Sequence, residues 1–349
     1  NQQNRSPMEA VACQGDSFEM GRQQGEALRT SIVGALQAIG DIEAFRLMKP
    51  RLIPLALFRK MAERRSDQFL KQAFACGPPA LAQRCEGIAS GAGVPIRKLA
   101  VCYALEAVLS DLTKQTEIGR ALESERLRSL AGYQAGCSAI AVCKEASADG
   151  QSLVIHNFDY LPIVQPFFCV RRSQPAGKLR SVEFTVSPLV GAVDGINEAG
   201  LAVTCNYAYV TDTARPSPTV TMVISDVLAN SRTVEEAVAR IESQPRVGGG
   251  LLMLADSAGA IASLEVSNTR VERRVAKQGR LFHTNQLQCD PMRTLQLHPN
   301  AVYGDRAPTL LRGRRVHESA ECRSNAIEQQ LPAFAPIGLN EMHRVLSDH

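Results

Sequence analysis

A glycine directly precedes a cysteine at Gly136-Cys137, within the stretch 131–138 that reads AGYQAGCS. Because Gly136 has no Cβ, its carbonyl can be approached closely and its peptide bond can be held in a strained conformation. A thiolate at Cys137 could attack that carbonyl, an N-to-S shift would give a thioester, and water would release a new N-terminus. The pair therefore predicts cleavage of the Gly136–Cys137 bond by the chain itself.

The product of that cleavage would carry its nucleophile and its base on one residue. A free α-amine has a reference pKa of about 7.7–8.0, close to the working pH of a general base. Since the amine and the thiol would both belong to Cys137, no catalytic histidine is required. A Gly-Cys pair at the start of a strand also fits a buried structural cysteine, so the interpretation depends on the surrounding sequence.

The part of the chain before Gly136 has the pattern of helices. Apolar residues recur at helical spacing with polar residues between them, and Gly77-Pro78-Pro79 breaks the pattern. The predicted helical stretches are Met20 to Leu47, Arg51 to Cys76, Lys98 to Leu112 and the charged, exposed stretch Glu117 to Leu130.

The part after Gly136 has the pattern of strands. Two pairs of short apolar runs flank turn residues, Ser138–Val142 with Ser152–Ile155 and Leu251–Ala255 with Ile261–Val266, as in β-hairpins. Thr233 to Glu242 is predicted to be a helix that begins from a cap at Ser231. Strands in series with few helices between them favour α+β layers over a doubly wound parallel sheet.

The composition excludes several classes of protein. Of 349 residues, 45% are apolar and 21% charged, with a net charge of +4, and no apolar run approaches the roughly 20 residues of a membrane span. The ten cysteines form no Cys-x-x-Cys and no histidine pair has zinc-site spacing, so no metal site is predicted. Nucleic-acid binding through Arg270–Arg274 and Arg312–Arg315 is disfavoured, because no aromatic platform accompanies these arginines.

Several ordered motifs resemble those of one family. The segments 136–141 (GCSAIA), Asp149-Gly150 and 156–160 (HNFDY) resemble the isopenicillin N acyltransferase (acyl-coenzyme A:6-aminopenicillanic acid acyltransferase) family of autoproteolytic N-terminal-nucleophile cysteine hydrolases. They resemble the bile-salt hydrolases more distantly. Further similarities follow in order at 18–25 (FEMGRQQG), 195–202 (GINEAGLA), 264–266 (LEV), 283–285 (HTN) and 309–315 (TLLRGRR).

The resemblance implies a fold and a set of site residues. It implies a four-layer αββα sandwich of two mainly antiparallel sheets, cut into a helical small chain of residues 1–136 and a large chain of residues 137–349. Cys137 matches the nucleophile, Asp159 the carboxylate near the new amine and Asn206 an oxyanion donor; Asn285 matches an orienting asparagine and Arg312 an arginine that binds the carboxylate or the substrate. His156 stands where bile-salt hydrolases have arginine and is interpreted as a strand residue.

The resemblance also implies an activity. We expect an S-acyl Cys137 formed from a small-molecule amide or acyl thioester, followed by hydrolysis or transfer to an amine, with no cofactor. The alternative is an uncleaved, inactive scaffold that binds ligands on the same fold. No secretory signal is visible, which favours a cytoplasmic location. The end at His349 comes before the C-terminal strand that the family leads us to expect, which predicts a truncated large chain.

Overall fold

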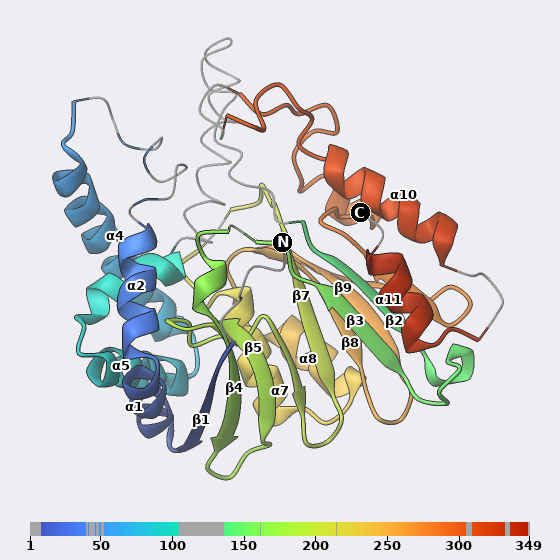
Figure 1. The fold of residues 1–349 in the computed structure, drawn as a ribbon, viewed down its shortest axis with the longest axis horizontal. Helices are drawn as coiled ribbons and strands as arrows, with labels where there is room; N and C mark the ends of the chain where they lie inside the picture. Colours follow the sequence, from blue (N-terminus) through green and yellow to red (C-terminus); the bar gives the residue numbers. More distant parts are fainter. Residues whose placement is uncertain are drawn as a thin grey trace, which may run out of the picture.

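Two β-sheets stacked between helices form the body of the protein (Figure 1). The computed structural model describes residues 8–39, 41, 46, 49, 52–104, 136–160, 162–213, 215–304, 309–331 and 336–347. The predicted α+β class is confirmed.

The larger sheet has eight strands in the order β1-β4-β5-β6-β7-β8-β9-β10. Each neighbouring pair is antiparallel except β1 and β4, which run parallel. Its strands are β1 (Glu9–Gly15), β4 (Phe168–Pro175), β5 (Ser181–Val186), β6 (Asp194–Asn197), β7 (Ala202–Ala208), β8 (Gly249–Ala255), β9 (Ile261–Val266) and β10 (Val271–Arg274).

The smaller sheet has the order β11-β2-β3, and both of its pairings are antiparallel. Strands β2 (Ser138–Val142) and β3 (Leu153–Asn157) form the hairpin predicted around Asp149-Gly150, while β11 (Arg280–His283) joins the other edge of β2. The second predicted hairpin is formed by β8 and β9.

Three apolar clusters define the order of the layers. One packs β7, β8 and β9 against helices α7 (Val220–Asn230) and α8 (Val234–Ser243). Another lies between the two sheets and joins Ala139 and Ala141 to Met253 and Ala255. The third packs Ile140 and Val142 of β2 against α10 (Glu318–Gln330) and α11 (Leu339–Ser347). The layers therefore run helix, sheet, sheet, helix, as the resemblance implied.

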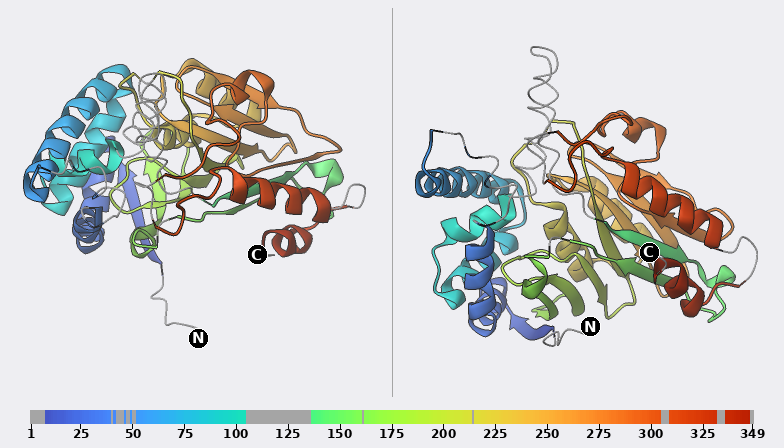
Figure 2. Two further views of the ribbon diagram at one scale, coloured as in Figure 1. Left: turned by 90° about the horizontal axis from the view of Figure 1, so that it is seen from above. Right: turned by 45° about the horizontal axis from the view of Figure 1, so that its top comes forward.

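The N-terminal helices lie at the β1 end of the larger sheet (Figure 2). They are α1 (Ser17–Ala27), α2 (Arg29–Ile39), α4 (Leu55–Cys76) and α5 (Pro79–Ala92). The first segment is not purely helical, because β1 pairs along its whole length with β4. The predicted helix Glu117 to Leu130 and most of Lys98 to Leu112 lie outside the described residues.

Two local predictions differ from the structure. The predicted helix Met20 to Leu47 is divided at Leu28 into α1 and α2. Helix α8 is capped by Thr233, whose hydroxyl accepts a hydrogen bond from the Glu236 amide, and not by Ser231. Ser231 instead ends α7, where its amide donates to the Val227 carbonyl. The remaining short elements are η1 (Lys144–Ala146), η2 (Gln165–Phe167) and α9 (Asp290–Arg293).

Candidate active site

Cys137 lies immediately before β2, at the end of the smaller sheet, and is fully buried. The β2–β3 hairpin returns the chain to this point, so the residues that follow β3 lie beside it. The Gly136 amide donates to the Asp159 carbonyl at 3.1 Å, and the Cys137 Sγ lies 3.9 Å from the same oxygen. A Cβ added to Gly136 would lie 3.0 Å from both Cβ and Oδ2 of Asp159. The glycine thus brings the backbone close to this carboxylate.

The two predicted asparagines reach the site from different sheets. Asn285 follows β11, whose register places His283 opposite Ala139, and this register continues towards Cys137. Its Nδ2 donates to the Tyr207 carbonyl at 2.8 Å. Asn206 is fully buried on β7 and its Nδ2 donates to the Thr284 carbonyl at 2.9 Å, while its Oδ1 has no hydrogen-bond partner among the described residues. In the uncut chain this amide is therefore directed at backbone next to Asn285.

An arginine that the sequence did not single out contacts Cys137. Arg323 of α10 donates from Nη1 to the Cys137 carbonyl and, at 2.8 Å, to the Ser138 hydroxyl, and from Nη2 to Asn285 Oδ1 at 2.9 Å. Burial lowers the pKa of Arg323, an effect opposed by Cys137 and Asp159. The predicted Arg312 lies exposed in the turn at 309–314. The arginine that contacts Cys137 is thus Arg323 of α10, which lies 11 residues after the predicted Arg312.

His156 is a further polar residue of the site. Its Nδ1 lies 2.9 and 2.8 Å from the two carboxylate oxygens of Asp194 on β6. Its Nε2 is buried without a hydrogen-bond partner among the described residues. Burial acts to lower the pKa of His156, but the charge of Asp194 and its hydrogen bond, together with the Cys137 thiol, raise it to about 10. This imidazole therefore holds a proton more tightly than a free histidine does.

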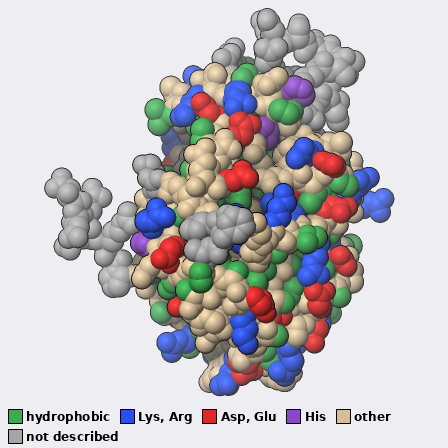
Figure 3. Space-filling model, turned by 90° about the vertical axis from the view of Figure 1, so that its right-hand side faces the viewer, with side chains coloured by type: hydrophobic (Ala, Val, Ile, Leu, Met, Phe, Trp, Pro, Cys, Tyr) green, Lys and Arg blue, Asp and Glu red, His purple; other side chains and the backbone are tan. Residues whose placement is uncertain are grey.

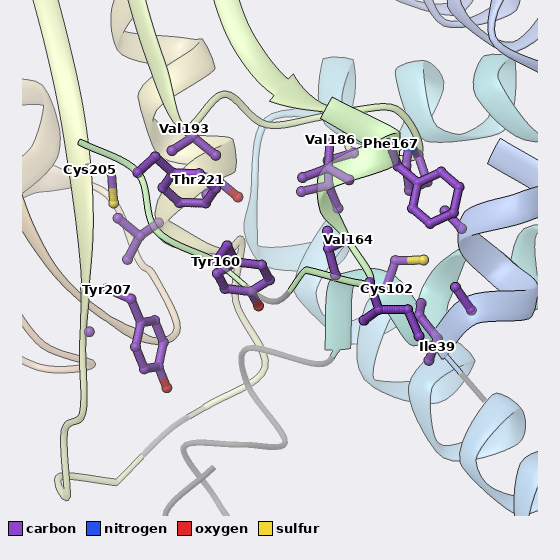
Figure 4. A pocket seen from close by; sticks show the side chains of 18 residues that line it. Ile39, Cys102, Tyr160, Val164, Phe167, Val186, Val193, Cys205, Tyr207 and Thr221 are labelled. Atoms are coloured by element: carbon purple, nitrogen blue, oxygen red, sulfur yellow. The ribbon is translucent and has the colours of Figure 1, made fainter. Parts of the chain in front are cut away.

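An apolar cavity of about 110 Å³ adjoins the strands that carry these residues (Figure 4). Cys205 and Tyr207 of β7 line one side and Ile39 of α2 lines another, with Tyr160 between them. Phe158, which immediately precedes Asp159, also lines it and stacks on Tyr160 with ring centroids 5.5 Å apart. The cavity wall is thus built from neighbours of Asp159 and Asn206.

One protein-family model matches most of the chain after Gly136. The model of the acyl-coenzyme A:6-aminopenicillanic acid acyl-transferase family matches residues 146–349, which is more than half of the chain. The chain belongs to this family. The acyl-transferase match contains Asp159, Asn206, Asn285 and Arg323, and it begins after Cys137.

Solved structures with similar folds give weaker similarities to this acyl-transferase family member. A Caenorhabditis elegans N-acylethanolamine-hydrolyzing acid amidase ortholog is 16% identical, with a TM-score of 0.41, over 60% of this chain and 86% of its own. A penicillin V acylase from Agrobacterium tumefaciens is 23% identical, with a TM-score of 0.28, over 46% and 48%. A mutant conjugated bile acid hydrolase from Clostridium perfringens is 18% identical, with a TM-score of 0.36, over 60% and 78%. No curated protein matched.

Among the residues that the structure describes, no group of three or more histidine, cysteine or acidic side chains is arranged to hold a metal ion. Within the same residues, every helix is too short or too polar to cross a membrane. All ten cysteines are described and none forms a disulfide.

Proposed function

We propose that this chain cleaves its own Gly136–Cys137 bond and then transfers acyl groups through Cys137. The observation that carries the proposal is the contact of Gly136 with Asp159, at the bond to be cut, while Arg323 and Asn285 lie on the other side of Cys137. Residues 1–136 would become a small chain and residues 137–349 a large chain. The acyl donor would be an amide or an acyl thioester, and the acceptor water or an amine.

The Cys137 sulfur bonds to the Gly136 carbonyl carbon, the C–N bond breaks, and the nitrogen leaves as the α-amine of Cys137. Water then hydrolyses the thioester and restores the thiol. In turnover the amine takes the thiol proton, the sulfur attacks the substrate carbonyl, and the amine returns the proton to the leaving nitrogen or thiolate. Water or an amine finally removes the acyl group.

The neighbours of Cys137 suit these steps. The Asp159 carboxylate is close enough to Gly136 to pair with the ammonium that cleavage creates beside it. Asn206 and Asn285 offer amide donors for the oxyanion of the tetrahedral intermediate, the role in which a single donor contributes about 10²–10³ in rate. We propose Arg323, in place of Arg312, as the arginine that orients Cys137 and Asn285.

The apolar cavity supports an apolar acyl group as the part of the substrate that the protein recognises. Its wall carries aliphatic and aromatic side chains, and the polar atoms of the site lie on the adjacent residues Asp159 and Asn206. Burying an apolar group there stabilises the complex in proportion to the area removed from water. The polar leaving group would then lie on the side of Asn285 and Arg323.

Intact-mass measurement of the purified protein tests the proposal. Wild type is expected as two chains, residues 1–136 and 137–349, and Cys137→Ala as one chain. The matched control is Cys143→Ala, which removes a partly buried cysteine at the other end of β2 and leaves the cut unchanged. A wild-type protein that turns over amides with its Gly136–Cys137 bond intact would contradict the mechanism.

The inactive scaffold is the second candidate, and the same measurement decides it, since it predicts one uncut chain for every variant. Three of the arginines considered for nucleic-acid binding form ion pairs with nearby glutamates. Arg273 pairs with Glu235, Arg314 with Glu318 and Arg315 with Glu321. On the face seen in Figure 3, basic and acidic side chains are interspersed. These arginines therefore offer no unbroken basic surface to a phosphate backbone.

A further inference from the structure

The uncut chain lacks the base that the cut chain would use. Before cleavage the nitrogen of Cys137 is part of a peptide bond, and an amide nitrogen accepts no proton at neutral pH. Cleavage nevertheless needs a thiolate, because the thiol itself is a poor nucleophile. Some other group must therefore take the Cys137 proton in the first step.

The register of the hairpin brings His156 to Cys137. Ala139 of β2 lies opposite His156 of β3, and Cys137 is two residues before Ala139. Side chains two residues apart point to the same face of a strand, so Cys137 and His156 face the same space between the sheets as diagonal neighbours. The neighbouring pair Ser138 and Asn157 points the other way, where Asn157 donates to the Leu346 carbonyl of α11.

The imidazole is oriented for proton transfer. Both oxygens of Asp194 lie within 2.9 Å of its Nδ1, which leaves Nε2 as the nitrogen free to meet another group. Asp194 is itself fixed, since its Oδ1 accepts a hydrogen bond from the Cys205 amide at 3.3 Å. Nε2 is buried and makes no other hydrogen bond with the described residues, although the ring interacts with the Cys137 thiol. Burying a nitrogen without a hydrogen-bond partner costs free energy, and a role in proton transfer explains why such a nitrogen is present here.

We propose that His156, oriented by Asp194, accepts the thiol proton of Cys137 in the uncut chain and thereby drives its self-cleavage. This inference rests on the proposed function. The proton moves from Sγ to Nε2, the thiolate attacks the Gly136 carbonyl carbon, and the imidazolium returns the proton to the departing nitrogen of Cys137. After the cut the α-amine takes over as base.

The charges around His156 support an imidazolium beside a thiolate. Asp194 from β6 and the Cys137 thiol from β2 both raise the pKa of His156, against the effect of burial. His283 from β11 is also near, but burial, together with Arg274 and His156, holds the pKa of His283 well below its usual value, so it stays neutral. Asp159 adds a second carboxylate on the Cys137 side. The positive charge at His156 is thus balanced by its neighbours.

The test follows the rate of self-cleavage after refolding, by intact mass, in His156→Gln, His156→Arg and Asp194→Asn. General acid–base catalysis contributes about 10²–10⁴ in rate, so at pH 7 His156→Gln is expected to cut at least about 100-fold more slowly than wild type. His156→Arg places a permanent positive charge at this position but cannot accept a proton, so it should be equally slow. Asp194→Asn should slow the cut at least about tenfold. His317→Gln, which alters a buried histidine bonded to the Leu297 carbonyl, is the control and should cut normally.

The pH dependence separates proton transfer from a structural role. Hydroxide can deprotonate a thiol directly near its ordinary pKa of about 8.5, so raising the pH from 7 to 9 should speed His156→Gln markedly. A variant that is merely misfolded would stay uncut at both pH values. If His156→Gln unfolds, as judged against Cys137→Ala by circular dichroism, Asp194→Asn carries the test.

Three results would overturn the inference. The first is cleavage of His156→Gln at pH 7 within threefold of wild type, and the second is a His156→Arg chain that cuts as fast as wild type. The third is a folded His156→Gln that gains nothing at pH 9. A wild-type chain that stays uncut would contradict the proposed function itself. The three results above contradict only the role of His156, so the two failures can be told apart.

Discussion

At the scale of single residues, Cys137 is surrounded by groups from three parts of the chain. Asp159 follows its own hairpin, Asn285 follows β11, His156 lies on β3 and Arg323 lies on α10. The guanidinium of Arg323 binds Cys137, Ser138 and Asn285 at once, so it fixes the chain directly after the Gly136–Cys137 bond. Its loss should therefore affect reaction geometry more than folding.

We expect Arg323→Met to lower the rate of substrate turnover by about 10²-fold or more, a loss typical of misplaced reacting groups. The physical reason is that Cys137 and Asn285 lose their shared donor. Arg312→Met is the matched control, because Arg312 is exposed in the turn at 309–314, and it should retain most activity. Turnover of an aryl amide by the cleaved proteins measures both. If Arg312→Met lost more turnover than Arg323→Met, Arg312 and not Arg323 would be the arginine of the site.

The sequence could predict some of these residues and not others. The position of Asp159 can be predicted from the sequence, because an Asp-Gly turn and two short apolar runs fix the β2–β3 hairpin locally. The role of Arg323 cannot be predicted from the sequence. It occurs in a polar helix, where the residue spacing does not distinguish it from an arginine exposed to solvent. The sequence places His156 on a strand, where it does lie, but it does not show the contact with Asp194, which is 38 positions away on the other sheet. Pairings across sheets leave no local pattern.

At the scale of elements, α1 and α5 cross with glycine on both sides of the contact. A Cβ on Gly21 would lie 2.1 Å from the Arg84 carbonyl oxygen, and one on Gly25 2.4 Å from that of Ile88. In return, a Cβ on Gly87 or Gly91 would lie 2.1 Å from a carbonyl oxygen of α1. These distances explain the glycine spacing of the motif at 18–25, because any side chain would separate the helices.

Gly25→Ala should therefore destabilise the protein, by about 2 kcal/mol or more, as overpacking against rigid backbone does. In an unpacked helix the same change stabilises by roughly 0.5–1 kcal/mol, so the sign of the effect is diagnostic. Gly34→Ala in α2 is the control, since its Cβ would meet only the Phe167 ring, at 3.0 Å, and a side chain can yield. Urea unfolding measures both, and a stabilised Gly25→Ala would show that the helices are not in close contact.

Strand β1 shows where prediction from the sequence stops at this scale. Residues 9–15 (EAVACQG) give only two buried positions, Val11 and Cys13, which is too short a pattern to separate from a loop. What makes the segment a strand is its parallel pairing with β4, in which Glu9 lies opposite Cys169. The hairpins β2–β3 and β8–β9 needed only their own turns, whereas β1 depends on a partner about 160 residues away.

At the scale of the whole molecule, the proposed cut divides one continuous core. Val11, Met20 and Leu99 on the N-terminal side share a cluster with Cys169 and Val190 on the other. Polar contacts cross the same boundary. Gln24 donates to the Ser187 and Leu189 carbonyls and accepts from the buried Arg171, whose charge is paired with Glu183. Neither chain could expose this surface to water without a large loss of hydrophobic stabilisation.

The cut protein should consequently behave as one particle. We expect residues 1–136 and 137–349 to elute together in size-exclusion chromatography, at the volume of uncut Cys137→Ala, and to separate only in denaturant. Gln24→Ala should weaken the association, because it removes one buried hydrogen-bond partner of Arg171 and the side-chain donor to the Ser187 carbonyl. Gln23→Ala removes only contacts near the surface, to Gln14 and Glu19. The fraction of small chain released in dilute urea measures the difference. Release of the small chain from wild type without denaturant would mean that β1 and α1 are not held by the sheet. It would contradict the conclusion that the two chains share one core.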